Sequence, residues 1–137
     1  MDLTRSELRQ KIMTILYQKN VYDTNKVEYQ IDDIIKEVSE IDNEFIKDMV
    51  YGVITYKSNI DSLANKYLNK WTIDRLGNTD QAILRMSIYE MLYTNTPDIV
   101  VINEAVELAK SYSDDKVKDM INGVLDKIYH EELDHEW

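Results

Sequence analysis

Hydrophobic residues recur at steps of three and four over almost the whole chain, which is the spacing of amphipathic helices. The first stripe runs from Leu8 to Leu16; Thr4 and Glu7 mark its start as a capping box, and Asn20 is its expected end. Further stripes cover residues 27–39, 45–54, 60–68, 82–93, 102–112 and 117–128. The pattern predicts an all-α fold, a compact helical bundle of six to seven helices around one core or two small bundles that share it.

Glycine and proline are scarce, with three glycines and one proline, so the tight turns of a sheet are not expected. Pro97 should end one helix, a break is expected near residues 58–59, and residues 71–77 should form a linker or a single turn. The expected N-terminal caps are Asp42, Asn78 with Gln81, and Ser113 or Asp114. Gly123 lies inside the last helix, where it costs about 1 kcal/mol relative to alanine, so we expect a close helix crossing there.

Length and composition limit the class of protein. A chain of 137 residues with 44% hydrophobic content favours one folded domain, expected over residues 1–130, followed by an acidic tail over residues 131–137. The absence of cysteine removes disulfides, thiolate metal sites and cysteine nucleophiles. The longest aliphatic run is Ile99–Ile102, whereas a membrane span needs roughly 20 residues, and no signal peptide is recognisable. We therefore expect a cytoplasmic protein that does not contact the membrane.

No residue pattern in the chain is typical of an enzyme. His130 and His135 are five residues apart, about 140° around a helix, whereas a zinc-binding pair shares one face at a spacing of four. The glycines are scattered and form no phosphate-binding loop. Acidic pairs such as Asp32-Asp33 have no histidine beside them to complete a proton relay. We expect no catalytic residue, no metal, no cofactor and no small-molecule substrate.

The charge of the chain is unevenly distributed. The net charge is −10, which disfavours nucleic acid, yet residues 1–20 hold four basic and two acidic side chains. Arg5, Arg9, Met13 and Tyr17 follow one edge of the first stripe at four-residue steps. Two guanidinium groups and a tyrosine ring in a row could bind phosphates and stack an unpaired RNA base. The alternative is that these residues border the core of an ordinary amphipathic helix.

Arg85 is a second conspicuous charge, because it lies among Ile83, Leu84 and Met86. An unpaired buried charge is costly, so Arg85 needs an acidic partner. We expect a structural ion pair with Glu104 or Glu90 that fixes the register of two helices. The alternative is that Arg85 binds a ligand.

Several blocks of the chain resemble one known family. They are Tyr51-Gly52-Val53, Ile60-Asp61, Trp71 to Leu76, Asp80 to Arg85 with Tyr89-Glu90, Pro97, Val101 to Lys110 and Ile121 to Lys127. Together with Arg9 and Leu16-Tyr17 in the first stripe, these blocks resemble the NusB family of bacterial transcription antitermination factors over nearly the whole chain.

The resemblance implies an all-helical protein without enzymatic activity. Members of the family bind the boxA element of ribosomal RNA leader transcripts together with the ribosomal protein NusE, in a complex with NusA, NusG and RNA polymerase that passes terminators. The resemblance assigns RNA contacts to Arg5, Arg9 and Tyr17. It assigns NusE or adjoining RNA contacts to the region of Lys116 and Met120.

Two departures from the family pattern affect these expectations. The family often has a denser arginine cluster where this chain has Ser6 and Glu7, which implies weaker RNA binding without NusE. Met120 replaces a usual aromatic residue, although methionine packs adaptably. The competing function is an acidic helical protein-interaction scaffold that does not contact RNA. Methyltransferases that carry a NusB-like domain are a further alternative, which the short chain and the lack of a glycine-rich cofactor loop disfavour.

Overall fold

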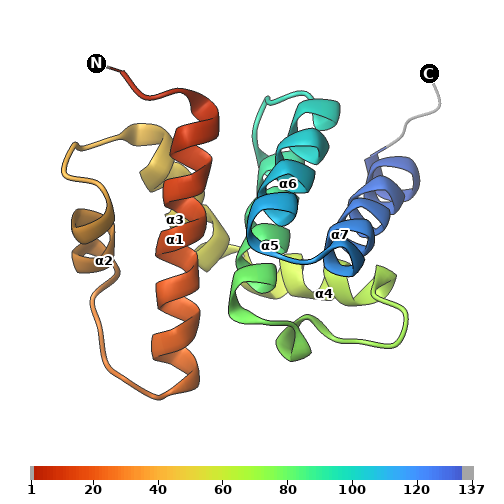
Figure 1. The fold of residues 1–137 in the computed structure, drawn as a ribbon, viewed down its shortest axis with the longest axis horizontal. Coiled ribbons are helices and arrows are strands. Elements are labelled where there is room, and N and C mark those ends of the chain that lie inside the picture. Colours follow the sequence, from red (N-terminus) through yellow and green to blue (C-terminus); the bar gives the residue numbers. More distant parts are fainter. Residues whose placement is uncertain (1, 134–137) are drawn as a thin grey trace.

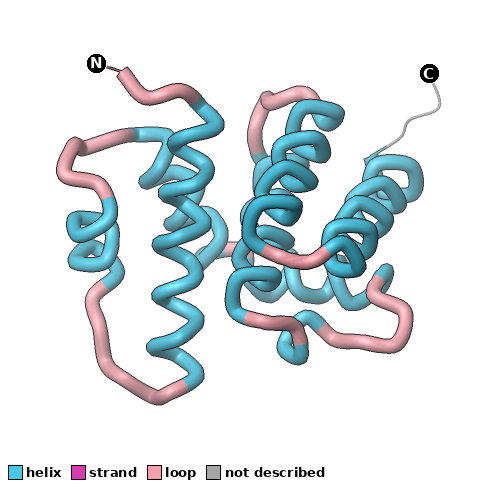
Figure 2. Tube along the Cα trace, in the orientation of Figure 1, coloured by secondary structure: helices cyan, strands magenta, loops and turns pink. Residues whose placement is uncertain are grey.

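A computed structural model describes residues 2–133, and this part of the chain contains seven α-helices and no strand (Figures 1 and 2). The helices are α1 (Arg5–Thr24), α2 (Ile31–Val38), α3 (Glu44–Thr55), α4 (Lys57–Tyr67), α5 (Asn78–Tyr93), α6 (Asp98–Tyr112) and α7 (Asp115–Ile128). A 3₁₀ turn, η1 (Ile73–Arg75), lies between α4 and α5, and a turn of π-helix, η2 (Tyr129–Leu133), follows α7. The predicted all-α fold of six to seven helices is confirmed.

Helix α5 is the centre of the molecule, because its residues from Ala82 to Met91 are all buried. It contacts α1, α3, α4, α6 and α7. Figure 1 shows α1, α2 and α3 on one side of the molecule and α6 and α7 on the other, with α4 crossing below. Because α5 is buried on every face, the two sides share one core.

Some helix ends follow the sequence pattern. The capping box is confirmed, since the Thr4 hydroxyl accepts a hydrogen bond from the Glu7 amide at 3.1 Å and the Glu7 carboxylate accepts one from the Thr4 amide at 2.8 Å. Asp114 caps α7 by accepting from the amide of Val117. Pro97 directly precedes α6, and η1 is the single turn expected within residues 71–77.

Other predicted ends are wrong, each because the true boundary lies a few residues away. Asn20 does not end α1, which continues to Thr24; the Asn20 side chain is buried and donates to the carbonyl of Asn78. Asn43, not Asp42, caps α3. Helices α3 and α4 meet at Tyr56, two residues before the expected break, and the residue before α5 is Gly77, with no side-chain cap from Asn78.

The close packing expected at Gly123 is found at Gly52 instead, where a side chain of another helix fills the space. A methyl group added at Gly52 would overlap the ring of Tyr89, which belongs to α5. A methyl group added at Gly123 would meet nothing within 4 Å. The prediction failed because a glycine inside a helix shows that a side chain is missing but not which face of the helix carries the gap.

The first residues of the expected acidic tail pack against α4. Residues 131–133 belong to η2, and the Glu132 carboxylate accepts hydrogen bonds from Lys66 and Tyr67 of α4, both at 2.6 Å. These hydrogen bonds lower the pKa of Glu132. The rest of the expected tail, residues 134–137, lies outside the described residues. Over residues 2–133, no helix is both long and apolar enough to cross a membrane.

Candidate nucleic-acid interface

Arg9 lies in the interior of the protein and not on an exposed ridge. Its side chain is 6% exposed, and its Nε and Nη2 donate to the two carboxylate oxygens of Glu90 at 2.9 and 2.6 Å. Its Nη1 donates to Glu104 at 3.3 Å. The hydrogen bonds to Glu90 raise the pKa of Arg9. Arg9 therefore joins α1 to α5 and α6, and it is not available to RNA in this arrangement.

The expected ridge fails because of helical geometry. Each four-residue step advances about 40° beyond a full turn, so Tyr17 lies about 120° around α1 from Arg5. The intermediate positions, Arg9 and Met13, are both buried. Arg5 and Tyr17 are exposed, but on different faces of α1. The predicted set of three thus becomes two separate surface residues.

Arg5 is held in place by an aromatic ring. Its guanidinium carbon lies 3.9 Å from the ring centroid of Phe45 in α3, a cation–π contact. Both side chains line a hollow of about 410 Å³ between the start of α1 and the segment that joins α2 to α3. The donors of an exposed guanidinium can bind a phosphate, although Asp2 and Glu44 also line this hollow.

Arg85 is buried and paired as expected, but its partner is Asp61 of α4. Arg85 Nε and Nη2 donate to the Asp61 carboxylate at 2.8 and 3.1 Å, and its Nη1 donates to Gln81 at 2.9 Å. The predicted pair with Glu104 or Glu90 is wrong, because both of these acids bind Arg9. Arg85 and Glu90 are five residues apart, so their side chains leave α5 in different directions.

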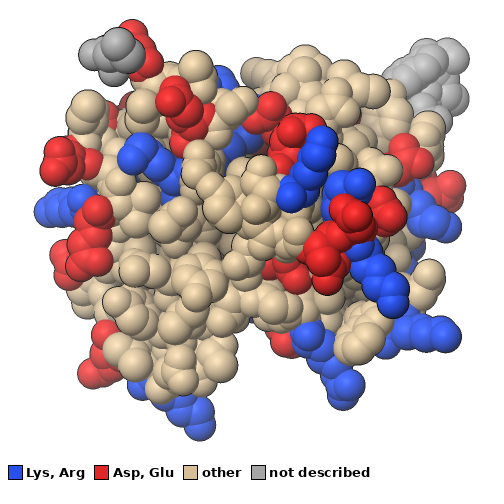
Figure 3. Space-filling view, viewed as in Figure 1, with Lys and Arg blue, Asp and Glu red and all other residues tan. Residues whose placement is uncertain are grey.

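Met120 lines a surface hollow of about 410 Å³ between α7 and the segment after α4. The other lining residues are Tyr67, Leu68, Asn69, Lys70, Trp71, Gly123, Val124 and Lys127. None of these is acidic, and Trp71 is 56% exposed. Figure 3 shows Lys and Arg side chains gathered at the lower right of this face, around α4 and the segment that leads to α5. We call the hollow lined by Met120 and these eight residues the α7 hollow.

The chemistry of the α7 hollow suits a single-stranded nucleic acid. Tyr67 and Trp71 provide rings on which a base can stack, and Lys70 and Lys127 provide charge for the backbone. Lys116 is exposed one turn before Met120. The sequence pointed to Met120 and Lys116 as contact residues but not to Trp71. A tryptophan in a short linker could have indicated a binding residue.

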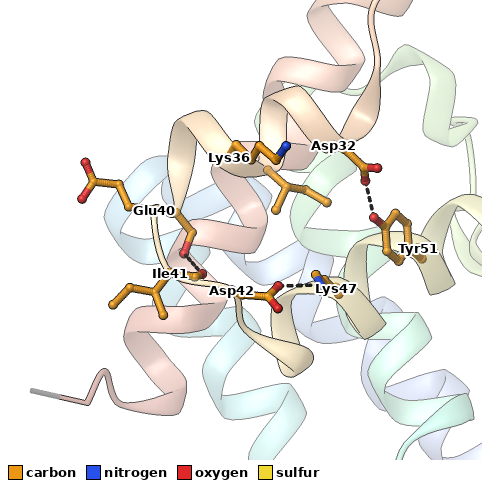
Figure 4. Close-up of a pocket in the computed structure, with 9 residues that line it drawn as sticks. Asp32, Lys36, Glu40, Ile41, Asp42, Lys47 and Tyr51 are labelled. Atoms are coloured by element: carbon orange, nitrogen blue, oxygen red, sulfur yellow. Dashed lines mark hydrogen bonds and ion pairs between the residues drawn. The ribbon is translucent and has the colours of Figure 1, made fainter.

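A third hollow, of about 310 Å³ between α2 and α3, has the opposite charge character to the α7 hollow (Figure 4). Asp32, Glu40 and Asp42 line it, and Asp42 forms an ion pair with Lys47 while the hydroxyl of Tyr51 donates to Asp32. Three carboxylates against two lysines make this hollow unfavourable for phosphate.

The described residues contain no cluster of three or more acidic or histidine side chains arranged to hold a metal ion. His130 lies 3.5 Å from Asp126, and His135 falls outside the described part of the chain. An all-helical protein in which an exposed tryptophan, a part-buried tyrosine and two lysines line one hollow belongs to the class of helical binding proteins.

Comparison with known proteins identifies the family. Residues 6–130 match the family model described as "NusB family". The chain is 40% identical over 128 residues to the transcription antitermination protein NusB of Campylobacter jejuni subsp. doylei, covering 91% of this chain and 95% of the relative. It is also 40% identical over 126 residues to the NusB of Halalkalibacterium halodurans, covering 91% and 92%. The chain belongs to the NusB family of transcription antitermination factors.

Solved structures agree with this assignment. T. maritima NusB superposes with a TM-score of 0.81 at 30% identity, covering 96% of this chain and 94% of that chain. A structure of the antitermination factors NusB and NusE in complex with dsRNA superposes with a TM-score of 0.77 at 30% identity, covering 92% and 96%.

Proposed function

We propose that this protein binds the boxA element of ribosomal RNA leader transcripts jointly with the ribosomal protein NusE. The bound complex joins RNA polymerase, NusA and NusG in the cytoplasm and helps the polymerase pass terminators. The observation that carries the proposal is the α7 hollow, which combines two aromatic rings and two lysines with no acidic side chain. The solved complex of NusB and NusE with dsRNA supports NusE and RNA as partners.

The surface charge explains why binding would be selective. With 26 acidic and 16 basic residues, most of the surface repels phosphate, so non-specific attraction is weak. RNA is then held where bases stack and a few cations are free, which are Arg5 and the α7 hollow. NusE adds a second set of contacts, so that each partner raises the effective concentration of the other.

Arg5 and Arg9 have different parts in this function. Arg5 is exposed and provides a phosphate contact, with its guanidinium packed over the Phe45 ring. Arg9 fixes α1 against α5 through Glu90 and so positions Arg5 without touching RNA. Tyr17 is 41% exposed and provides a stacking surface. Met120 contacts RNA or NusE at the α7 hollow, and Lys116 does so one turn earlier on α7.

The variant Arg5→Ala tests the RNA contact. In the presence of NusE, its affinity for boxA RNA should fall, and the slope of log affinity against log salt should decrease by about 0.7, one phosphate contact on a single strand. The control is Lys36→Ala, which removes an exposed cation at the acidic hollow between α2 and α3 and should change neither quantity. An unchanged salt slope for Arg5→Ala would refute its phosphate contact, and no preference for boxA would favour the scaffold function.

A further inference from the structure

Tyr112 is an exposed aromatic residue that the function above does not use. It is the last residue of α6, and its side chain is 45% exposed. The Gln10 amide of α1 donates a hydrogen bond to its hydroxyl. In the sequence, Tyr112 fits the apolar stripe of its helix and so looks like a core residue. The structure instead places it on the surface, bonded to a helix about 100 residues earlier in the chain.

On one side, Tyr112 borders the face of α1 that carries Tyr17. Gln10, Thr14 and Tyr17 are spaced by four and three residues, so they share one face of the helix, and all three are exposed. Tyr17 lies two turns beyond Gln10, about 10 Å along the helix axis. The rings of Tyr112 and Tyr17 therefore lie along the same edge of α1.

On the other side, Tyr112 leads directly to α7. The Ser113 hydroxyl donates to Asp80, and the Asp114 carboxylate accepts from the amide of Val117, which fixes the turn between α6 and α7. Lys116 follows Tyr112 by four residues, in the first turn of α7. Figure 1 shows this turn between α1 and α7. Tyr112 thus lies between Tyr17 and the helix that carries Met120.

The charges around Tyr112 determine what it can bind. Asp114 and Asp115 are exposed beside it and repel phosphate, whereas Lys110 and Lys116 lie on either side in the chain. A tyrosine ring offers a neutral face on which any base can stack, and this contact does not depend on phosphate attraction. At this point of the surface, the contact is therefore with a base and not with the backbone.

We propose that Tyr112 stacks a base of the bound RNA single strand and connects Tyr17 on α1 with the α7 hollow into one continuous track. The proposal rests on the proposed function, because it requires that the protein binds RNA. Gln10 is a positioning residue in this arrangement, since its amide holds the Tyr112 hydroxyl against α1.

The test compares Tyr112→Leu, Tyr112→Phe and the control Tyr51→Leu. Tyr51 is a matched control because it is 39% exposed and its hydroxyl also bonds a side chain of another helix, Asp32. Binding of fluorescent boxA RNA is measured with NusE present. Tyr112→Leu should weaken binding about tenfold, the effect of one lost base stack, with an unchanged salt slope. Tyr112→Phe keeps the ring and should bind within about threefold of the original protein, and Tyr51→Leu should bind equally well.

A spectroscopic measurement detects base stacking directly, so that a loss of stacking is distinguished from a loss of folding. Single 2-aminopurine substitutions along boxA report base stacking, and one position should be quenched by the unaltered protein and by Tyr112→Phe but not by Tyr112→Leu. Equal affinity and equal quenching for Tyr112→Leu would overturn the role of Tyr112 while leaving the proposed function intact. Failure of the unaltered protein to bind boxA RNA would instead overturn the proposed function, and the track with it.

Discussion

Replacing Gly52 with alanine should destabilise the protein, although alanine is the better helix former. Gly52 is buried inside α3, and a methyl group there would overlap the Tyr89 ring. The ring has little freedom to move, because it stacks on Tyr93 at a centroid distance of 5.3 Å and its hydroxyl donates to Asp48 at 3.3 Å. The overlap must therefore be relieved by shifting helix α3 or the ring stack.

The size of the stability change caused by Gly52→Ala follows from two opposing effects. Alanine in place of glycine inside a helix gains about 1 kcal/mol, whereas overpacking a well-packed core costs about 1 to 3 kcal/mol. Because Tyr89 is held on its far side, we take the upper end of that cost, which leaves a net loss of about 2 kcal/mol. For a domain of this size the melting temperature should fall by about 7 °C.

Urea and thermal unfolding followed by circular dichroism measure the effect, and Gly123→Ala is the matched control. Gly123 also lies inside a helix, but its missing side chain faces open space, so alanine should stabilise the protein by up to about 1 kcal/mol. In a Tyr89→Leu background, the loss caused by Gly52→Ala should largely disappear. A Gly52→Ala protein as stable as the original would refute the reasoning.

Two further predictions concern ion pairs. Arg85→Met should lower the free energy of unfolding by about 3 kcal/mol, because it leaves Asp61 without its bidentate partner, and it should leave RNA affinity nearly unchanged. A double-mutant cycle with Asp61→Asn should show strong coupling between the two residues, and additive effects on the free energy of unfolding would contradict the pair. Lys66 and Tyr67 lower the pKa of Glu132 in the folded state, so this carboxylate contributes stability above its unfolded pKa and loses it as pH falls through the folded value. In urea unfolding, Glu132→Gln should therefore be less stable than the original protein at pH 7, and the difference should shrink as the pH falls below the ordinary pKa of a glutamate. A difference that is the same at every pH would contradict the assignment.

The helices could be predicted from the sequence because their signals are local. Three- and four-residue steps identify each helix, and the Thr4 and Asp114 caps depend on residues three positions away. Caps failed where two capping residues are adjacent, as with Asp42 and Asn43, since both side chains can accept hydrogen bonds and only the backbone decides between them.

The site was predicted less well because its geometry depends on distant contacts. The burial of Arg9 follows from Glu90, which is 81 residues away in the chain, and no local pattern links the two. Trp71 looked like part of a linker until the fold placed it beside Met120. Arg5 and Tyr17 are exposed as the sequence indicated, but their separation around α1 appears only when the drift of the four-residue step is followed over twelve residues.

The most direct test of the central claim is a titration of labelled boxA RNA and a scrambled RNA with the protein, with and without NusE, at several salt concentrations. The account predicts weak binding by the protein alone and a clear preference for boxA when NusE is present. Equal affinity for the two RNAs under both conditions would contradict the proposed function and identify the protein as a scaffold that does not recognise boxA RNA.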